Sequence, residues 1–106
     1  MSPIKFVQFS DVKAKATELY NHDVVASYNL AGRFLDILNC QIEAALEDRM
    51  SSVNSTFDVV KGYNIHLVCD SMREAFDASG WPEKAVRIVP VDDIDPVIQV
   101  RLDWLA

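Results

Sequence analysis

The sequence has few of the residues on which most catalytic and ligand-binding motifs depend. Its 106 residues include three glycines, two cysteines and two histidines. The glycines are too scattered to form a phosphate-binding loop or a dinucleotide fingerprint. The cysteines and histidines form no CxxC or HExxH motif, and no serine lies in a GxSxG motif. The sequence therefore predicts no catalytic residue, no metal ligand and no cofactor, and we expect a protein that is not an enzyme.

Long apolar runs are also absent. No run approaches the ~18 residues that a membrane span requires, and the chain does not open with the charged and apolar regions of a signal peptide. We therefore expect an intracellular protein that does not bind membranes. Cys40 and Cys69 are too few for a disulfide-stabilised fold, so we expect both thiols to be reduced.

Positive charge is scarce. Ten Lys and Arg residues stand against 16 Asp and Glu residues, which gives a net charge of −6. A chain of this charge repels a phosphate backbone, so we expect no direct binding of nucleic acid. The densest acidic cluster, Asp92, Asp93 and Asp95, favours a basic protein surface as a partner. These three residues and Trp81, in the loop Gly80-Trp81-Pro82, are the candidate partner-binding residues.

The N-terminal half of the chain predicts helices. Residues 4–9 predict an extended segment or a short strand, after which a first helix begins with Ser10 as its cap and ends at residues 21–23. Residues 24–50 predict a long helix whose apolar arc spans roughly 200°, twice the ~100° of a helix covered on one side. We expect the sheet to cover one side of this helix, and the first helix or a second subunit to cover the other. The candidate oligomer-face residues on this arc are Leu30, Phe34, Leu38 and Ile42.

The C-terminal half predicts a small sheet. Apolar residues at helical spacing predict a further helical piece from Val53 to Lys61, although Thr56 and Val59-Val60 leave a strand as the alternative. After it we expect strands at 63–69, 86–88 and 98–104, a capping-box helix at 71–79 and a turn at 91–96. The predicted fold class is α+β. N-terminal helices, including one long helix, pack on a three-stranded mixed sheet (β-α-β-β), all in one domain over residues 1–106.

The last two predicted strands place two arginines on the same side of the sheet. Ile98, Val100 and Leu102 alternate with polar residues, so one face of this strand is buried and the other is wet. Arg87 and Arg101 both fall on the wet face of the hairpin, where cross-strand neighbours lie close together. They are the candidate anion-binding residues.

The order of these elements carries a resemblance to a known group of proteins. A long helix that closes before Gly62 is followed by a strand, a short helix ending in Ala78-Ser79-Gly80-Trp81, and two strands ending in Val100-Arg101-Leu102-Asp103-Trp104. Over residues 30–104 this layout resembles small uncharacterised accessory proteins of tailed bacteriophages. The resemblance implies a phage origin and a location in the cytoplasm of the bacterial host, and it transfers no catalytic residue.

Three functions are consistent with these expectations. The first is a small acidic inhibitor that docks on a host protein, with the acidic cluster at a basic cleft. The second is a structural or assembly protein of a phage, a homo-oligomer whose subunits contact through the long helix and hold a small anion or nucleotide between them. The third is an immunity or antitoxin protein that covers the basic active site of a toxin.

Overall fold

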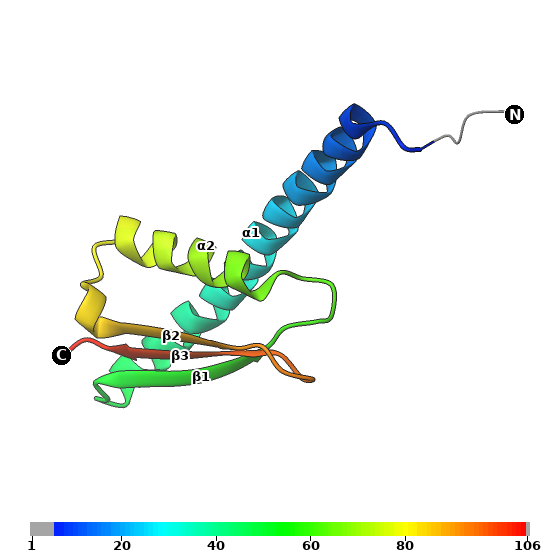
Figure 1. Cartoon of the computed structure of the whole chain (residues 1–106). Coiled ribbons are helices and arrows are strands. Elements are labelled where there is room, and N and C mark those ends of the chain that lie inside the picture. Colours follow the sequence, from blue (N-terminus) through cyan, green and yellow to red (C-terminus); the bar gives the residue numbers. More distant parts are fainter. Residues whose placement is uncertain (1–5, 106) are drawn as a thin grey trace, which may run out of the picture.

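The computed structural model describes residues 6–105. It confirms an α+β fold in which a long helix and a second helix accompany a three-stranded sheet (Figure 1). A single 3₁₀ turn, η1 (Glu83–Ala85), follows the second helix. The helices and strands, in chain order, are α1 (Phe9–Glu47), β1 (Ser52–Asp58), α2 (Ile65–Ala78), β2 (Val86–Val91) and β3 (Val97–Asp103).

The sheet is antiparallel throughout, so the mixed sheet predicted from the sequence is wrong. Its strand order is β1-β3-β2, and β3 pairs antiparallel with both neighbours. The two outer strands therefore run parallel to each other with β3 between them, and α2 connects them as a split β-α-β unit. The predicted C-terminal hairpin is confirmed as β2 and β3.

Helix α1 has no break at the place where the sequence predicts one. It runs for 39 residues, which is about 58 Å at 1.5 Å per residue. Residues 21–23 are weak helix formers, but none of them prevents helical geometry as proline does. The predicted cap at Ser10 is wrong as well, because the helix begins at Phe9 after Gln8. Of the extended segment or strand predicted at 4–9, residues 6–8 belong to no strand, Gln8 has extended backbone angles, and residues 4–5 lie outside the described part.

Helix α2 occupies the segment in which a strand was predicted. Its buried residues follow the three- and four-residue spacing of a helical face: Ile65, Val68, Cys69, Met72 and Phe76. The Asn64 side chain accepts hydrogen bonds from the backbone N–H groups of His66 (3.1 Å) and Leu67 (3.2 Å), and so caps the first turn. The predicted capping box at Ser71 and Glu74 therefore lies inside the helix.

The segment before α2 is the strand β1, which corrects the helical prediction for 53–61 and agrees with its alternative. Val53 and Phe57 are buried on the face that meets the helices, and Asn54 and Thr56 are exposed on the other face. This two-residue alternation is typical of a strand that is covered on one side.

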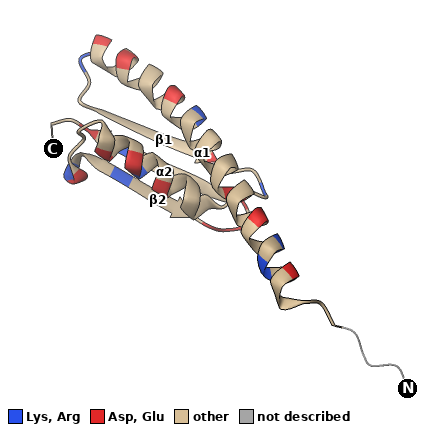
Figure 2. Cartoon of the chain, turned by 90° about the horizontal axis from the view of Figure 1, so that it is seen from above, with Lys and Arg blue, Asp and Glu red and all other residues tan. Residues whose placement is uncertain are grey.

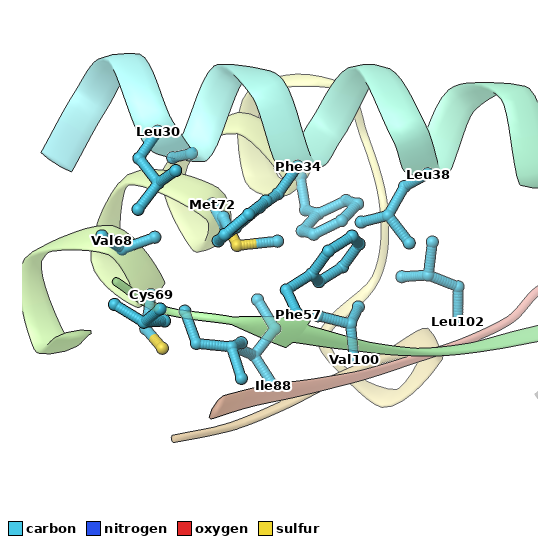
Figure 3. Packing of buried hydrophobic residues seen from close by; sticks show 14 of the residues in the cluster. Leu30, Phe34, Leu38, Phe57, Val68, Cys69, Met72, Ile88, Val100 and Leu102 are labelled. Atoms are coloured by element: carbon cyan, nitrogen blue, oxygen red, sulfur yellow. The ribbon is translucent and has the colours of Figure 1, made fainter. Parts of the chain in front are cut away.

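Both helices lie on the same face of the sheet and enclose the core with it (Figure 3). Phe34 of α1 stacks on Phe57 of β1 with 4.5 Å between ring centroids and an interplanar angle of 18°. Leu38, Met72 and Leu102 are also fully buried in this cluster. Within residues 6–105, no helix lies on the opposite face of the sheet, so we call it the open face.

Candidate docking surfaces

The first 18 residues of α1, residues 9–26, project from the rest of the molecule (Figures 1 and 2). We call this segment the arm, and we call residues 27–105 the body. The radius of gyration is 19.0 Å, whereas a compact chain of 100 residues has about 13 Å. Side chains along the arm are exposed, apart from the half-buried Asp23 and Ala26 at its base. The arm is thus a single helix with water on all sides.

One side of the arm is apolar. At 100° per residue, six positions with alternating three- and four-residue spacing form a strip along the helix. We call it the arm stripe: Phe9, Val12, Ala16, Leu19, Asp23 and Ala26. Phe9 is 79% exposed and Leu19 is 54% exposed. The same strip continues into the body, where Leu30 and Phe34 are buried in the core. The arm therefore exposes to water the apolar face that the body buries.

The arm carries little net charge. It holds three acidic residues against two lysines, whereas residues 27–105 hold thirteen acidic residues against seven basic ones. Figure 2 shows the arm charges interspersed along the helix. The one ion pair between opposite fixed charges on the arm, Lys15 with Glu18 at 3.7 Å, is exposed and contributes little stability. The acidity of the chain therefore belongs to the body.

The four predicted oligomer-face residues do not form a free surface. Leu30, Phe34 and Leu38 are 8%, 7% and 1% exposed, and all three contribute to the core of their own chain. Ile42 is half-buried against the same core. The sequence identified the correct face of α1 but placed its uncovered part in the wrong half of the helix.

The predicted acidic cluster lies in the loop that joins β2 and β3. Asp92, Asp93 and Asp95 are exposed, and Ile94 between them is 94% exposed. The Asp93 carboxylate accepts a hydrogen bond from the backbone N–H of Ile94 (2.8 Å). The loop borders an open hollow of about 770 Å³ that also includes Asp23, so this loop lies near the base of the arm.

Trp81, the fourth candidate partner-binding residue, is half-buried against the core. Its ring meets Phe76 edge-on, with 6.0 Å between centroids and an interplanar angle of 72°. It lines a cleft of about 540 Å³ between α2 and β2. In the same cleft, Arg73 donates a hydrogen bond to the carbonyl of Ile88 (3.0 Å) and thereby occupies one free backbone group at the edge of the sheet.

The two candidate anion-binding arginines are brought together. Arg87 and Arg101 are direct cross-strand partners on the open face of the sheet, and both are exposed. A shallow hollow of about 400 Å³ surrounds them, with Thr56 and Gln99 among its lining residues. Arg101 lies 3.9 Å from the Asp103 carboxylate, and Arg87 forms no ion pair within the described residues. Directly opposed like charges destabilise a strand pair.

The two thiols occupy different environments. Cys40 is exposed on α1, and Cys69 is fully buried on α2. Burial raises the pKa of the Cys69 thiol, while the nearby Arg73 lowers it and Asp70 raises it further. Among residues 6–105 there is no group of three or more His, Cys, Asp or Glu side chains that could hold a metal ion.

Comparisons of this chain with protein-family models, with curated proteins and with solved structures give no match. Over the described part of the chain, neither helix has a stretch that is both long enough and apolar enough to cross a membrane.

The sequence did not predict the arm as a surface. Val12, Ala16 and Leu19 fall in the predicted first helix, which, or a second subunit, was expected to cover the other side of the long helix. The signal was nevertheless present, because the three- and four-residue spacing continues without a change of phase from Phe9 through residues 21–23 to Leu30. A spacing that continues without interruption indicates one continuous helix. The first part of such a helix cannot fold back and pack on the second part.

Proposed function

We propose that this protein acts by docking on another protein chain through the arm stripe, without catalysing a reaction. The observation that supports the proposal is the exposed apolar strip on a helix that has no cover. A contiguous apolar surface on a projecting element is typical of a protein-protein contact. An amphipathic helix of this kind binds through residues spaced three and four apart, either in a groove or against another helix.

The composition of the arm supports the same proposal. An isolated helix shorter than ~12–15 residues is marginal in water even when it is rich in alanine, and most helices in proteins depend on packing of an apolar face. The arm is only slightly longer, and it contains weak helix formers such as Val12, Thr17 and Asn21. A partner that covers the arm stripe would supply the missing stabilisation.

The acidic loop supports a second candidate function. Asp92, Asp93 and Asp95 surround the exposed Ile94, so the loop offers an apolar tip within negative charge. Such a tip suits a basic cleft with an apolar floor, as in an inhibitor of a host protein or an immunity protein. A phage origin, which the resemblance implies, is compatible with either candidate.

Site-specific photo-crosslinking separates these surfaces. A photoreactive amino acid is placed at Leu19 on the arm, at Ile94 in the acidic loop or at Thr56 on the open sheet face, and the cells that produce the protein are irradiated. We expect discrete adducts from position 19 and none from position 56. Adducts from position 94 alone would replace the proposal with the second candidate. If neither position 19 nor position 94 gives an adduct, both candidates are wrong.

A further inference from the structure

We infer that the partner of the arm is a second copy of this chain, and that the two arms pair antiparallel through their arm stripes. The inference rests on the proposed docking function and names its partner. Four features of the chain support it: the order of large and small residues along the arm stripe, the single charge within it, the distribution of charge between arm and body, and the hollow at the base of the arm.

Large and small side chains along the arm stripe complement each other in the antiparallel direction. When the arms are aligned over their full length, Phe9 lies opposite Ala26 of the second copy, and Leu19 lies opposite Ala16 of the second copy. Phe9 and Leu19, the two largest residues of the arm stripe, thus each meet an alanine, as close packing of two helices requires. In a parallel pair, by contrast, Phe9 would meet Phe9 and Ala16 would meet Ala16, which leaves a crowded layer and an empty one.

Asp23 is the one charged residue in the arm stripe. Within its own chain the carboxylate lies 3.8 Å from Nδ1 of His22, and no lysine or arginine of the described residues pairs with it. Antiparallel pairing places it opposite Val12 of the second copy, within reach of the neighbouring Lys13. Parallel pairing would set two Asp23 side chains against each other, and a half-buried carboxylate pair without counter-charges is unfavourable.

The acidic bodies favour the same orientation. Residues 27–105 carry an excess of six negative charges in each copy. Antiparallel arms hold the two bodies at opposite ends of a helix pair about 27 Å long. That separation exceeds the Debye length of about 8 Å at physiological ionic strength, so repulsion between the bodies is largely screened. Parallel arms would bring both bodies to the same end.

The base of the arm offers a place for the end of the second chain. In the full-length antiparallel alignment, Phe9 of each copy stops where the other copy enters its body at Ser27. Phe6 and Val7, which are 86% and 65% exposed, then reach the level of the hollow beside the base. That hollow is lined in part by Val60 and Ile94, which are exposed apolar residues as well.

The first test is the mass of the full-length chain in solution, measured by sedimentation equilibrium over a concentration series. We expect a reversible dimer with twice the 11.9 kDa mass of one chain. Leu19→Lys on the arm stripe should give a monomer, whereas Glu18→Lys on the opposite side of the helix should leave the dimer intact. A cooperative urea transition in each variant verifies that the body remains folded.

A charge exchange tests the contact itself. Asp23→Lys alone and Lys13→Asp alone should each weaken dimerisation by about ten-fold, because each contact occurs twice in a symmetric dimer. The double variant should restore it. Residues 13 and 23 lie about 15 Å apart along one helix, so restoration requires contact between copies. A double variant as weak as the singles would overturn the assigned contact.

Cysteine pairing tests the orientation. In a Cys40→Ser background, a mixture of Val12→Cys and Asp23→Cys chains should form the mixed disulfide faster than either chain forms a disulfide with itself. Preferential self-pairing would show parallel arms and contradict the inference. A chain that stays monomeric at all concentrations, while position 19 crosslinks to a protein of another mass, would refute the second copy and leave the docking function standing.

Discussion

The two halves of α1 share one apolar pattern but differ in environment. In the body, the face that contains Phe34 and Leu38 is buried against β1 and α2. In the arm, the same face carries Phe9 and Leu19 into water. The comparison shows that helical spacing identifies a face that requires cover but does not identify what covers it. In the body the cover comes from the same chain, and in the arm we propose that it comes from another.

The largest difference between the halves should be seen in stability. Phe34→Ala removes a buried ring that stacks on Phe57, and we expect a loss of about 3–5 kcal/mol in the free energy of unfolding. Leu19→Ala, in dilute solution where the arm is uncovered, should change it by less than about 0.5 kcal/mol. Urea denaturation measures both. A cost at Leu19 comparable to that at Phe34 would mean that the arm is already packed within one chain.

The starts of the two helices offer a second comparison. Asn64 caps α2 with two hydrogen bonds, whereas Gln8 before α1 makes no side-chain cap. Asn64→Ala should therefore cost about 1 kcal/mol of unfolding free energy. Asn54→Ala, on the open face of β1, is the matched control and should have little effect. Equal effects at the two positions would contradict the capping role of Asn64.

On the open face of the sheet, we expect one substitution to increase the stability of the protein. Arg87→Glu replaces a directly opposed pair of like charges with an opposite-charge pair at Arg101, and we expect a gain of about 0.2–1 kcal/mol. The gain should shrink in high salt, because salt screens exposed charges. Arg33→Glu, on the exposed side of α1, serves as a control. A loss of stability with Arg87→Glu would indicate that the arginine pair binds an anion that stabilises the fold.

The last comparison is between the two thiols of the body, for which we expect the smallest effect on the free energy of unfolding. Cys40 should react with a thiol reagent at neutral pH within minutes, while Cys69 should react only after unfolding. Because burial raises the pKa of Cys69 above its unfolded value, its protonated form favours the native state. This contribution to the free energy of unfolding is fully present below the ordinary thiol pKa of about 8.5, and it is lost as the pH rises through the raised pKa of native Cys69. Fast labelling of Cys69 in the native protein would contradict its burial.

The sequence predicted the elements that depend on a long regular pattern. The α+β class is confirmed. The C-terminal hairpin is confirmed as well, and it was predictable because the residues around Ile98, Val100 and Leu102 alternate clearly between apolar and polar. Short apolar segments fitted a helix and a strand equally well. Ile65, Leu67 and Cys69 alternate as in a strand. The residues at helical spacing from Ile65 to Phe76 form a longer apolar face, and burial of that face favours the helix over the strand. In β1, the pairing with β3 decided in favour of a strand.

The candidate site was less predictable than the fold. The cross-strand proximity of Arg87 and Arg101 followed from strand alternation alone. The burial of Leu30, Phe34 and Leu38 depended on where α2 packs, and the sequence placed a strand there. The half-burial of Trp81 depended in the same way on the position of Phe76 at the end of α2. Surfaces that form between elements distant in sequence require the three-dimensional arrangement.

Amide hydrogen exchange at two protein concentrations tests the central claim most directly. In the body, amides on α2 and β3 should be protected at both concentrations. In the arm, amides from residue 13 to residue 26 should be protected at high concentration and should exchange rapidly on dilution, because the helix loses its cover when the copies separate. Arm amides that stay protected at a dilution where the chain is monomeric would contradict the account, since the arm would then need no partner.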